Sequence, residues 1–324
     1  MRQLLAKIGY LAGMLWLISV ISFLAIHAAP HSFFSAGELN PNMTPQALEH
    51  LARIYGLDKP LWEQYLSWMV ALLTFDFGLS FVTGKKVIVE IQERIGITLF
   101  LNTLTLFATF ALALWLGIKA ALSPNSTTDK RIKTLSLISF AMPSFYLAIV
   151  LILLFGVYLE WTPIAGLHSI DIDANNPWLY YIDMAWHLLL PLSVMIFVSI
   201  GSMTLYVRSL AIDIAKSDYL FLAKARNLPP QKIIRFYIIP NLLPPIVTLL
   251  GLSLPALIGG SVILEKIFAI DGMGNLFFTS AMSRDYPVIM GILIITAFLT
   301  LLGNMLSDMV LMRLNPFFKQ SKQR

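Results

Sequence analysis

Six stretches of the chain stay apolar for about 20 residues or more, and more polar segments separate them. An α-helix rises about 1.5 Å per residue, so about 20 apolar residues cross the roughly 30 Å hydrocarbon core of a bilayer. The pattern predicts an all-α integral membrane protein with about six transmembrane helices. These spans are expected at roughly Ile8–Ala29, Ile97–Leu122, Leu135–Tyr158, Trp186–Val207, Ile246–Ile267 and Val288–Met312.

Composition excludes a soluble enzyme. Hydrophobic residues make up 57% of the 324 residues and charged residues only 13%, whereas soluble domains carry about 25% charged residues. The mean hydropathy of +0.75 agrees. The chain has no cysteine, which excludes disulfides, thiolate catalysis and cysteine metal sites.

The Lys and Arg residues predict the orientation in the membrane. If the N-terminus lies inside, 16 of the 23 Lys and Arg residues fall on the inner side and 7 on the outer side. Inner loops of membrane proteins carry the excess of positive charge. We therefore expect both termini in the cytoplasm. The net charge of +5 is explained in the same way, without a nucleic-acid partner.

The spans divide the chain into regions. The first apolar run covers about 22 residues, longer than the roughly 7–15 of a signal-peptide core, so it is interpreted as a retained helix. The expected regions are an N-terminal tail and first helix (1–29), a periplasmic segment (30–96) with a short helix near Thr44–Tyr55, a transmembrane core (97–312) containing an inner loop (208–245), and a cytoplasmic tail (313–324).

The inner loop, Arg208–Pro245, begins with signals for a short helix. Ser217 or Asp218 can cap its first turn. Asn227 falls at its expected end, where the left-handed backbone conformation suits Asn better than most residues. These positions predict a helix of about ten residues in the middle of the loop.

Prolines divide the loop into two helices. Pro229-Pro230 stops the first helix and can open a second, which is expected at roughly Gln231–Ile239 and to end at Pro240-Asn241. Small side chains at Ala223 and Ala225 would let another surface approach the first helix closely. An amphipathic helix lying on the inner leaflet remains the alternative.

The same loop resembles the permeases of ATP-binding-cassette importers, specifically the B-type subunits of the peptide/nickel (oligopeptide/dipeptide) family. That family has a loop similar to D-Y-x-x-x-A-x-A-x-G-L, with Asn227 here in place of the glycine. The loop positions that match are Asp218-Tyr219, Ala223, Ala225, Asn227-Leu228, Asn241 and Pro244 or Pro245. Other similar pieces occur in order along nearly the whole chain, namely Tyr55–Leu61, Phe75–Ser80, Glu265–Phe268, Gly272-Met273-Gly274, Arg284–Pro287 and Asn315-Pro316.

The resemblance implies a type I ABC-importer fold in the bacterial inner membrane and a division of labour. Two cytoplasmic ATPase subunits would bind ATP and Mg, a second, different permease subunit would complete a heterodimer, and a periplasmic or lipoprotein substrate-binding protein would deliver cargo. This chain itself would hold no cofactor, metal or catalytic residue, and it contains no phosphate-binding loop of the G-x-x-x-x-G-K-[ST] kind.

The resemblance also implies two groups of site residues. Residues that would couple to the ATPase are Asp218, Tyr219, Ala223, Ala225, Asn227 and Leu228. Residues that would dock the binding protein are Asp58, Lys59, Gly272, Gly274, Asp285 and Tyr286.

Several alternatives stay open. An ion-driven secondary transporter would need charges or broken helices at the bilayer midplane, and few charges lie in the spans. Di- and oligopeptides, nickel or its chelates, and antimicrobial peptides are all cargoes that the resemblance allows. His27 and His31 could share a helix face as metal ligands, but Pro30 lies between them and no third ligand is evident.

Overall fold

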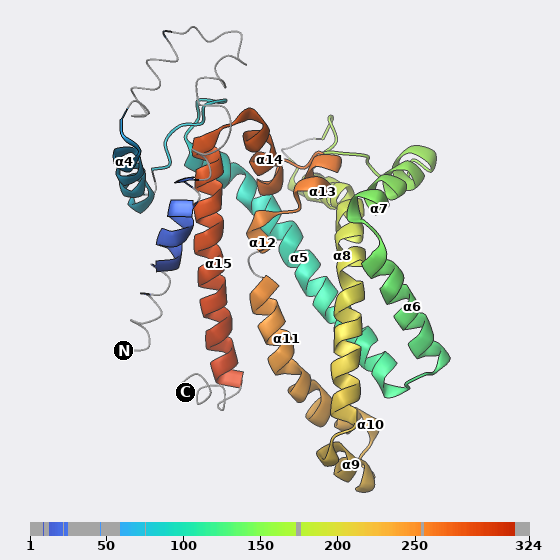
Figure 1. Cartoon of the computed structure of the whole chain (residues 1–324). Coiled ribbons are helices and arrows are strands. Elements are labelled where there is room, and N and C mark those ends of the chain that lie inside the picture. The colour runs from blue at the N-terminus through green and yellow to red at the C-terminus, as the bar shows by residue number, and fades with distance from the viewer. Residues whose placement is uncertain are drawn as a thin grey trace. The chain divides into compact units, whose positions relative to one another are not determined.

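The computed structural model describes residues 59–172 and 176–314, apart from Phe75 and residues 254–255, together with short pieces of the first helix and position 46. The chain forms two compact units. The first combines residues 1–98 with 272–302, and the second combines residues 99–271 with 303–324. Each unit is described below by itself (Figure 1).

The described residues are helical, apart from loops and one isolated bridge between Leu79 and Lys86. The α-helices are α4 (Leu61–Leu73), α5 (Val87–Leu122), α6 (Thr127–Ala141), α7 (Ser144–Leu151), α8 (Pro177–Ala215), α9 (Asp218–Ala225), α10 (Pro230–Ile233), α11 (Ile239–Ser253), α12 (Ala256–Gly259), α13 (Val262–Ile267), α14 (Met273–Ser283) and α15 (Tyr286–Leu314). Two π-helical segments, Ile152–Tyr158 and Ile234–Ile238, continue α7 and α10.

The described residues contain four or five candidate spans, where the sequence predicts six. Within the described residues, four helices are long and apolar enough to cross a membrane: Val87–Leu122, Pro177–Ala215, Pro230–Ser253 and Tyr286–Met305. A fifth span results if the bent pair Thr127–Ala141 and Ser144–Tyr158 crosses as one. Within the predicted first span, the described residues, which are 9, 13–21 and 23–24, are helical. The predicted helix at 44–55 lies outside the described residues, apart from position 46.

The third predicted span is broken. A single helix over Leu135–Tyr158 was expected, but the two halves meet at 98°. Pro143 lies at the break with an extended backbone. Proline lacks an N–H and disfavours helical geometry in the residue before it, here Met142, which is also extended.

The prediction for the fifth span was wrong in its position. The expected inner helix does not end at Pro240, because the chain stays helical from Pro230 to Ser253. Pro244 and Pro245 lie inside α11. Membrane helices tolerate internal prolines where the freed backbone groups are satisfied. Pro240, Pro244 and Pro245 therefore do not mark a helix end here.

The first unit has its core between the start of α5, α14 and the start of α15. Buried apolar residues from these helices and the preceding loop form one cluster: Phe77, Val87, Ile91, Met273, Leu276, Val288 and Ile292. Gly291 allows the close approach, because a β-carbon there would lie 2.8 Å from a methyl group of Val87.

In the second unit, α8 packs against both α5 and α6. At Gly117 a β-carbon would lie 2.7 Å from the Val207 side chain. At Gly201 it would lie 2.3 Å from the Ser136 carbonyl oxygen and 2.6 Å from the Ser139 hydroxyl. Small residues at helix crossings let backbones meet closely inside membranes. Glycine therefore allows close packing at two places along α8, against α5 near Val207 and against α6 at Gly201.

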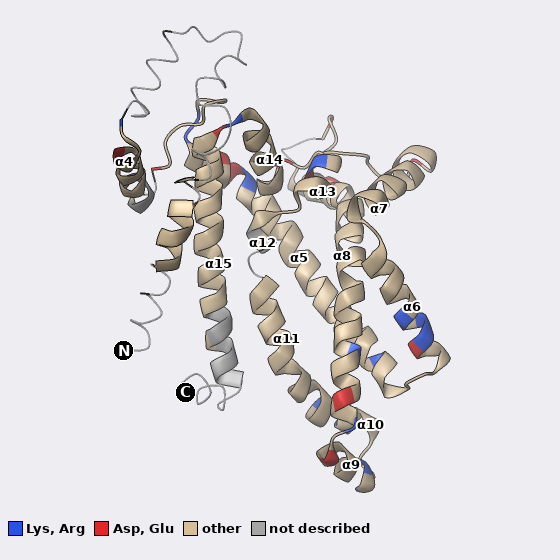
Figure 2. Ribbon diagram, in the orientation of Figure 1, with Lys and Arg blue, Asp and Glu red and all other residues tan. Residues whose placement is uncertain are grey.

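Charged side chains of the second unit lie near its two ends. Figure 2 shows most Lys and Arg at the end that carries α9, α10 and the start of α6, with apolar helix between the ends. Both loops that were predicted to be cytoplasmic thus lie at the same end of this unit. This agrees with the predicted topology inside the unit, and the orientation in the membrane remains a prediction.

Candidate functional site

Helix α9 lies where the sequence predicts the first loop helix. Ser217 is its N-cap residue by backbone geometry, but the predicted side-chain cap is absent, because the Ser217 hydroxyl donates to the Ile214 carbonyl at 2.6 Å. Asn227 follows the helix with a left-handed φ of 53°, as predicted. Pro229 is the N-cap residue of α10, and Pro230 is its first residue, so the predicted two-helix division is confirmed.

Two faces of α9 have different surroundings. Leu220 and Ala223 are 1% and 2% exposed, and Leu220 belongs to a buried cluster that also contains Val207, Ile233 and Leu242. Ala223, predicted as a contact for a partner, therefore faces its own chain. The helix is fixed to the second unit by this inner face.

The outer face of α9 carries apolar side chains that the sequence reasoning missed. Phe221 is 71% exposed and Leu222 is 62% exposed. They lie between Tyr219 and Ala223 in the sequence. Of the predicted coupling residues, Leu228 is half-buried, and the exposed ones are Asp218, Tyr219, Ala225 and Asn227. Leu220 and Ala223 are three residues apart, so they share one side of the helix. Phe221 and Leu222 lie between them and therefore face the opposite side, which the spacing in the sequence could have shown.

A buried ion pair lies at the same end of the second unit. Arg208 near the end of α8 donates from Nε and Nη2 to the Asp129 carboxylate of α6, at 2.5 and 2.7 Å. The Asn125 amide donates to the same carboxylate at 2.8 Å. The fork of two hydrogen bonds fixes orientation as well as distance. It joins α6 to the part of α8 that leads into α9.

Asp285, predicted to dock a binding protein, is instead buried inside the first unit. It accepts hydrogen bonds from the Ser80 hydroxyl and from the Phe81 amide, the latter at 3.1 Å. Asp285 as a whole is 2% exposed. The Ser80 oxygen in turn accepts from the Thr83 amide at 3.0 Å. Asp285 therefore holds the turn at 80–83 and offers no side chain to a partner.

The other predicted docking residues differ in exposure. Gly272 and Gly274 are buried at the start of α14, where the Met273 amide donates to the Thr98 hydroxyl at 2.8 Å. Tyr286 is half-buried and Lys59 is exposed. Asp58 lies outside the described residues. Lys59 is thus the one of these residues, among those described, that is exposed and available to a partner.

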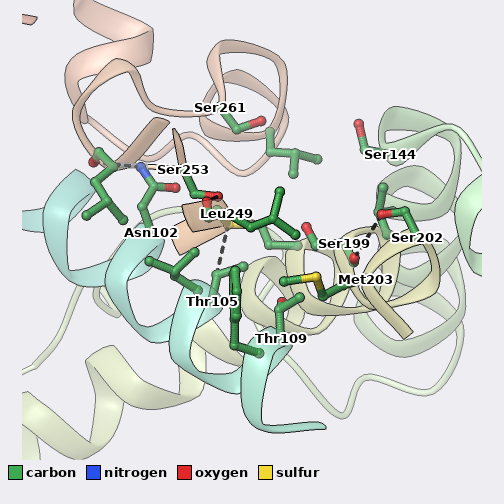
Figure 3. A pocket seen from close by; sticks show the side chains of 16 residues that line it. Asn102, Thr105, Thr109, Ser144, Ser199, Ser202, Met203, Leu249, Ser253 and Ser261 are labelled. Atoms are coloured by element: carbon green, nitrogen blue, oxygen red, sulfur yellow. Dashed lines mark hydrogen bonds between the residues drawn. The ribbon is translucent and has the colours of Figure 1, made fainter. Parts of the chain in front are cut away.

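A cavity of about 460 Å³ lies within the second unit, between α5, the start of α7, α8 and the segment from α11 to α13. Figure 3 shows side chains from these helices pointing toward one space. Eight of the lining residues carry a hydroxyl or amide, and none of the described lining residues is charged. The polar ones are Asn102, Thr105, Thr109, Ser144, Ser199, Ser202, Ser253 and Ser261.

The polar lining comes from helical stripes. Asn102, Thr105 and Thr109 are three and four residues apart on α5, so they share one face. The Asn102 side-chain amide donates to the Leu257 carbonyl at 3.0 Å, which joins α5 to α12. The sequence reasoning missed this stripe, although the spacing of polar residues inside an apolar run was visible.

Comparison with known proteins identifies the family. A sequence model described as the inner membrane component of binding-protein-dependent transport systems matches residues 113–320, and the model of the corresponding N-terminal component matches residues 1–102. The chain belongs to this family of transport permeases. The permease is accordingly a multi-pass inner-membrane protein.

Curated relatives agree along nearly the full length. The oligopeptide transport system permease protein AppB of Bacillus subtilis is 32% identical over 97% of both chains. The dipeptide transport system permease protein DppB of Lactococcus lactis subsp. cremoris is 31% identical over 97% of this permease and 98% of the relative. The peptidoglycan transport system permease protein YejB of Agrobacterium fabrum is 33% identical over 85% of this permease and 76% of the relative.

A solved structure shares the fold. A chain from the MetNI methionine ABC transporter, in an inward-facing conformation, matches with a TM-score of 0.53 at 15% identity. The match covers 69% of this permease and 96% of that chain. The all-α, type I importer fold predicted from the sequence is confirmed, and the resemblance to peptide permeases is confirmed by the relatives.

Proposed function

We propose that this permease carries di- or oligopeptides across the inner membrane, driven by separate ATPase subunits that dock on α9. Its relatives are named for oligopeptide and dipeptide transport, which favours peptides over nickel as the cargo. The observation that supports docking is that α9 has one buried side and one exposed apolar side. One side is buried in the second unit through Leu220 and Ala223, and the other exposes Phe221 and Leu222.

An exposed apolar pair at a basic, charged end is suited to a protein partner. Aromatic side chains are enriched where protein surfaces bind each other, and a few buried anchors supply most of the binding energy. The inner anchoring makes α9 a rigid part of the second unit. Movement of a docked ATPase would therefore be transmitted to α8, which precedes α9 directly.

The docking is tested with Phe221→Asp. Loss of an aromatic anchor typically weakens binding by about 2 kcal/mol or more, a roughly 30-fold weaker association. We expect the ATPase to be lost when the variant complex is purified, and peptide uptake to fall at least tenfold. Ile170→Asp, at a fully exposed loop position, is the matched control and should retain the ATPase. Full retention by Phe221→Asp would refute docking on this face.

Ala223 is less suitable for such a test. Because it is buried, a large charged substituent there would disturb packing within the chain before it reached a partner. The same reasoning applies to Leu220. Phe221 and Leu222 can be changed without creating a buried charge.

The outer segments of the first unit are proposed to receive a substrate-binding protein, and a second, different permease subunit is proposed to complete the transporter. Exposed Lys59 is available for direct contact. Asp285 would act indirectly by holding the turn at 80–83. Gly272 and Gly274 would act by letting α14 begin close to α5.

The cargo is tested by uptake. Cells lacking the genes of this transporter, with and without a plasmid that restores them, are given labelled dialanine and nickel in parallel. Restored uptake of dialanine is expected. Restored uptake of nickel alone would overturn the peptide assignment and leave the permease family unchanged.

A further inference from the structure

The cavity between α5 and α8 differs in character from a surface that faces lipid or another apolar helix. Its polar side chains come from four separate parts of the chain and meet in one space (Figure 3). Polar residues inside membrane spans usually face the bundle interior or a water-filled cavity. The volume of about 460 Å³ lies within the range of about 300–1,000 Å³ that is usual for small-molecule sites.

Thr109 provides a second, independent observation. The residue is 5% exposed, it lines the cavity, and its hydroxyl has no hydrogen-bond partner among the described residues. A buried hydroxyl without a partner is unfavourable. A molecule that entered the cavity and hydrogen-bonded to Thr109 would remove that cost.

We propose that this cavity is a binding site for the uncharged peptide groups between the two charged termini of a peptide cargo, and that Thr109 is a specificity-determining residue within it. The proposal rests on the peptide function proposed above. A peptide bond carries one donor and one acceptor, and both need partners away from water. A hydroxyl can donate and accept, so Ser and Thr suit either group without fixing the direction of the chain.

Because none of the described lining residues is charged, the site should prefer cargo with neutral side chains. A charged cargo side chain would lose its hydration there without meeting an ion partner, which is costly in a low-dielectric setting. Neutral side chains can instead contact the apolar part of the lining, such as Leu106 and Met203. The site therefore favours peptides with small neutral side chains over peptides rich in Lys or Glu.

Thr109→Val tests the role of the hydroxyl, since Val has nearly the same shape. Uptake of labelled trialanine, measured below saturation in cells expressing the complete transporter, should fall about 2- to 10-fold, as expected for one lost hydrogen bond. Thr204→Val is the matched control. Thr204 is also on a span, is fully buried and has an unpartnered hydroxyl among the described residues, but it does not line the cavity. Its variant should transport at the wild-type rate.

A second experiment tests whether the cavity is reached by water and by cargo. The chain has no cysteine, so a single introduced thiol can be followed alone on this subunit. Both Ser199 and Ser193 are exposed on α8, but Ser199 lines the cavity and Ser193, six residues earlier, lies outside the lining. A charged, water-soluble thiol reagent should label Ser199→Cys in membranes at least five times faster, and trialanine should slow that labelling.

The outcomes separate the two proposals. Wild-type import of trialanine with equal uptake by the Thr109→Val and Thr204→Val variants would overturn the cavity site and leave the peptide function standing. Labelling of Ser199→Cys no faster than Ser193→Cys, or unaffected by trialanine, would also overturn it. If the wild-type transporter imports no peptide at all, the peptide function fails and the assignment of the cavity to peptides fails with it.

Discussion

At the scale of single residues, Asp129 and Arg208 form a pair that should matter for stability. Asp129 is 2% exposed, and its carboxylate is bonded by Arg208 and by the Asn125 amide. Removing one member of a buried pair leaves the other charge uncompensated, at a cost of about 3–5 kcal/mol. Asp129→Asn should therefore lower the free energy of unfolding by about that amount, measured by thermal unfolding of the purified complex in detergent.

Two further variants distinguish charge from geometry at this pair. Arg208→Lys keeps the charge but loses the two-pronged hydrogen bonding, so it should be intermediate in stability. Asp129→Asn combined with Arg208→Met removes both charges and should recover part of the loss. An Asp129→Asn complex that melts with the wild type would show that the pair contributes nothing.

At the scale of elements, the crossing of α6 and α8 depends on Gly201. A β-carbon there would lie 2.3 Å from the Ser136 carbonyl and 2.8 Å from the Phe140 amide nitrogen. Both are backbone atoms, so the helices themselves would have to separate. Gly201→Ala should destabilise the complex by about 1–3 kcal/mol, the usual cost of overpacking, again measured by thermal unfolding.

Gly96→Ala is the control for this crossing. A β-carbon at Gly96 of α5 would meet nothing within 4 Å. Alanine is a better helix former than glycine by roughly 0.5–1 kcal/mol, so this variant should be as stable as the wild type or slightly more stable. Equal melting of the Gly201→Ala and Gly96→Ala complexes would contradict the close crossing.

The elements also show what the sequence could and could not predict. Apolar run length was enough to place α5, α8 and α15, because crossing a bilayer sets a minimum length for each. The short helix α9 and its left-handed end at Asn227 followed from local capping and proline signals. These features depend on neighbouring residues alone, so one sequence contains them.

The errors arose where distant contacts decide the outcome. Pro143 breaks its helix, whereas Pro191, Pro244 and Pro245 lie inside continuous helices. Nothing in the neighbouring sequence separates these cases, because the partners that stabilise a proline-containing helix come from other turns or other helices. The burial of Asp285 likewise depends on Ser80 and Phe81, some two hundred residues earlier.

At the scale of the whole molecule, the distribution of charge predicts the orientation in the membrane. Within the second unit, α9, α10 and the start of α6 form the basic end, and the end of α8 that follows the loop at 159–172 is the other end (Figure 2). Positive loops of inner-membrane proteins remain in the cytoplasm. The basic end is therefore expected inside, where an ATPase can reach α9, and the loop with Ile170 is expected in the periplasm.

Single cysteines on the cysteine-free chain test this orientation. Ile170→Cys and Lys130→Cys are both at exposed positions, so both thiols should react once a reagent reaches them. A membrane-impermeant maleimide should label Ile170→Cys in intact spheroplasts, and should label Lys130→Cys only in inverted vesicles or after the membrane is permeabilised. The reverse pattern would place α9 in the periplasm and would rule out docking of a cytoplasmic ATPase on its Phe221 face. Because both variants retain peptide uptake in the expected case, the labelling would report on the working transporter.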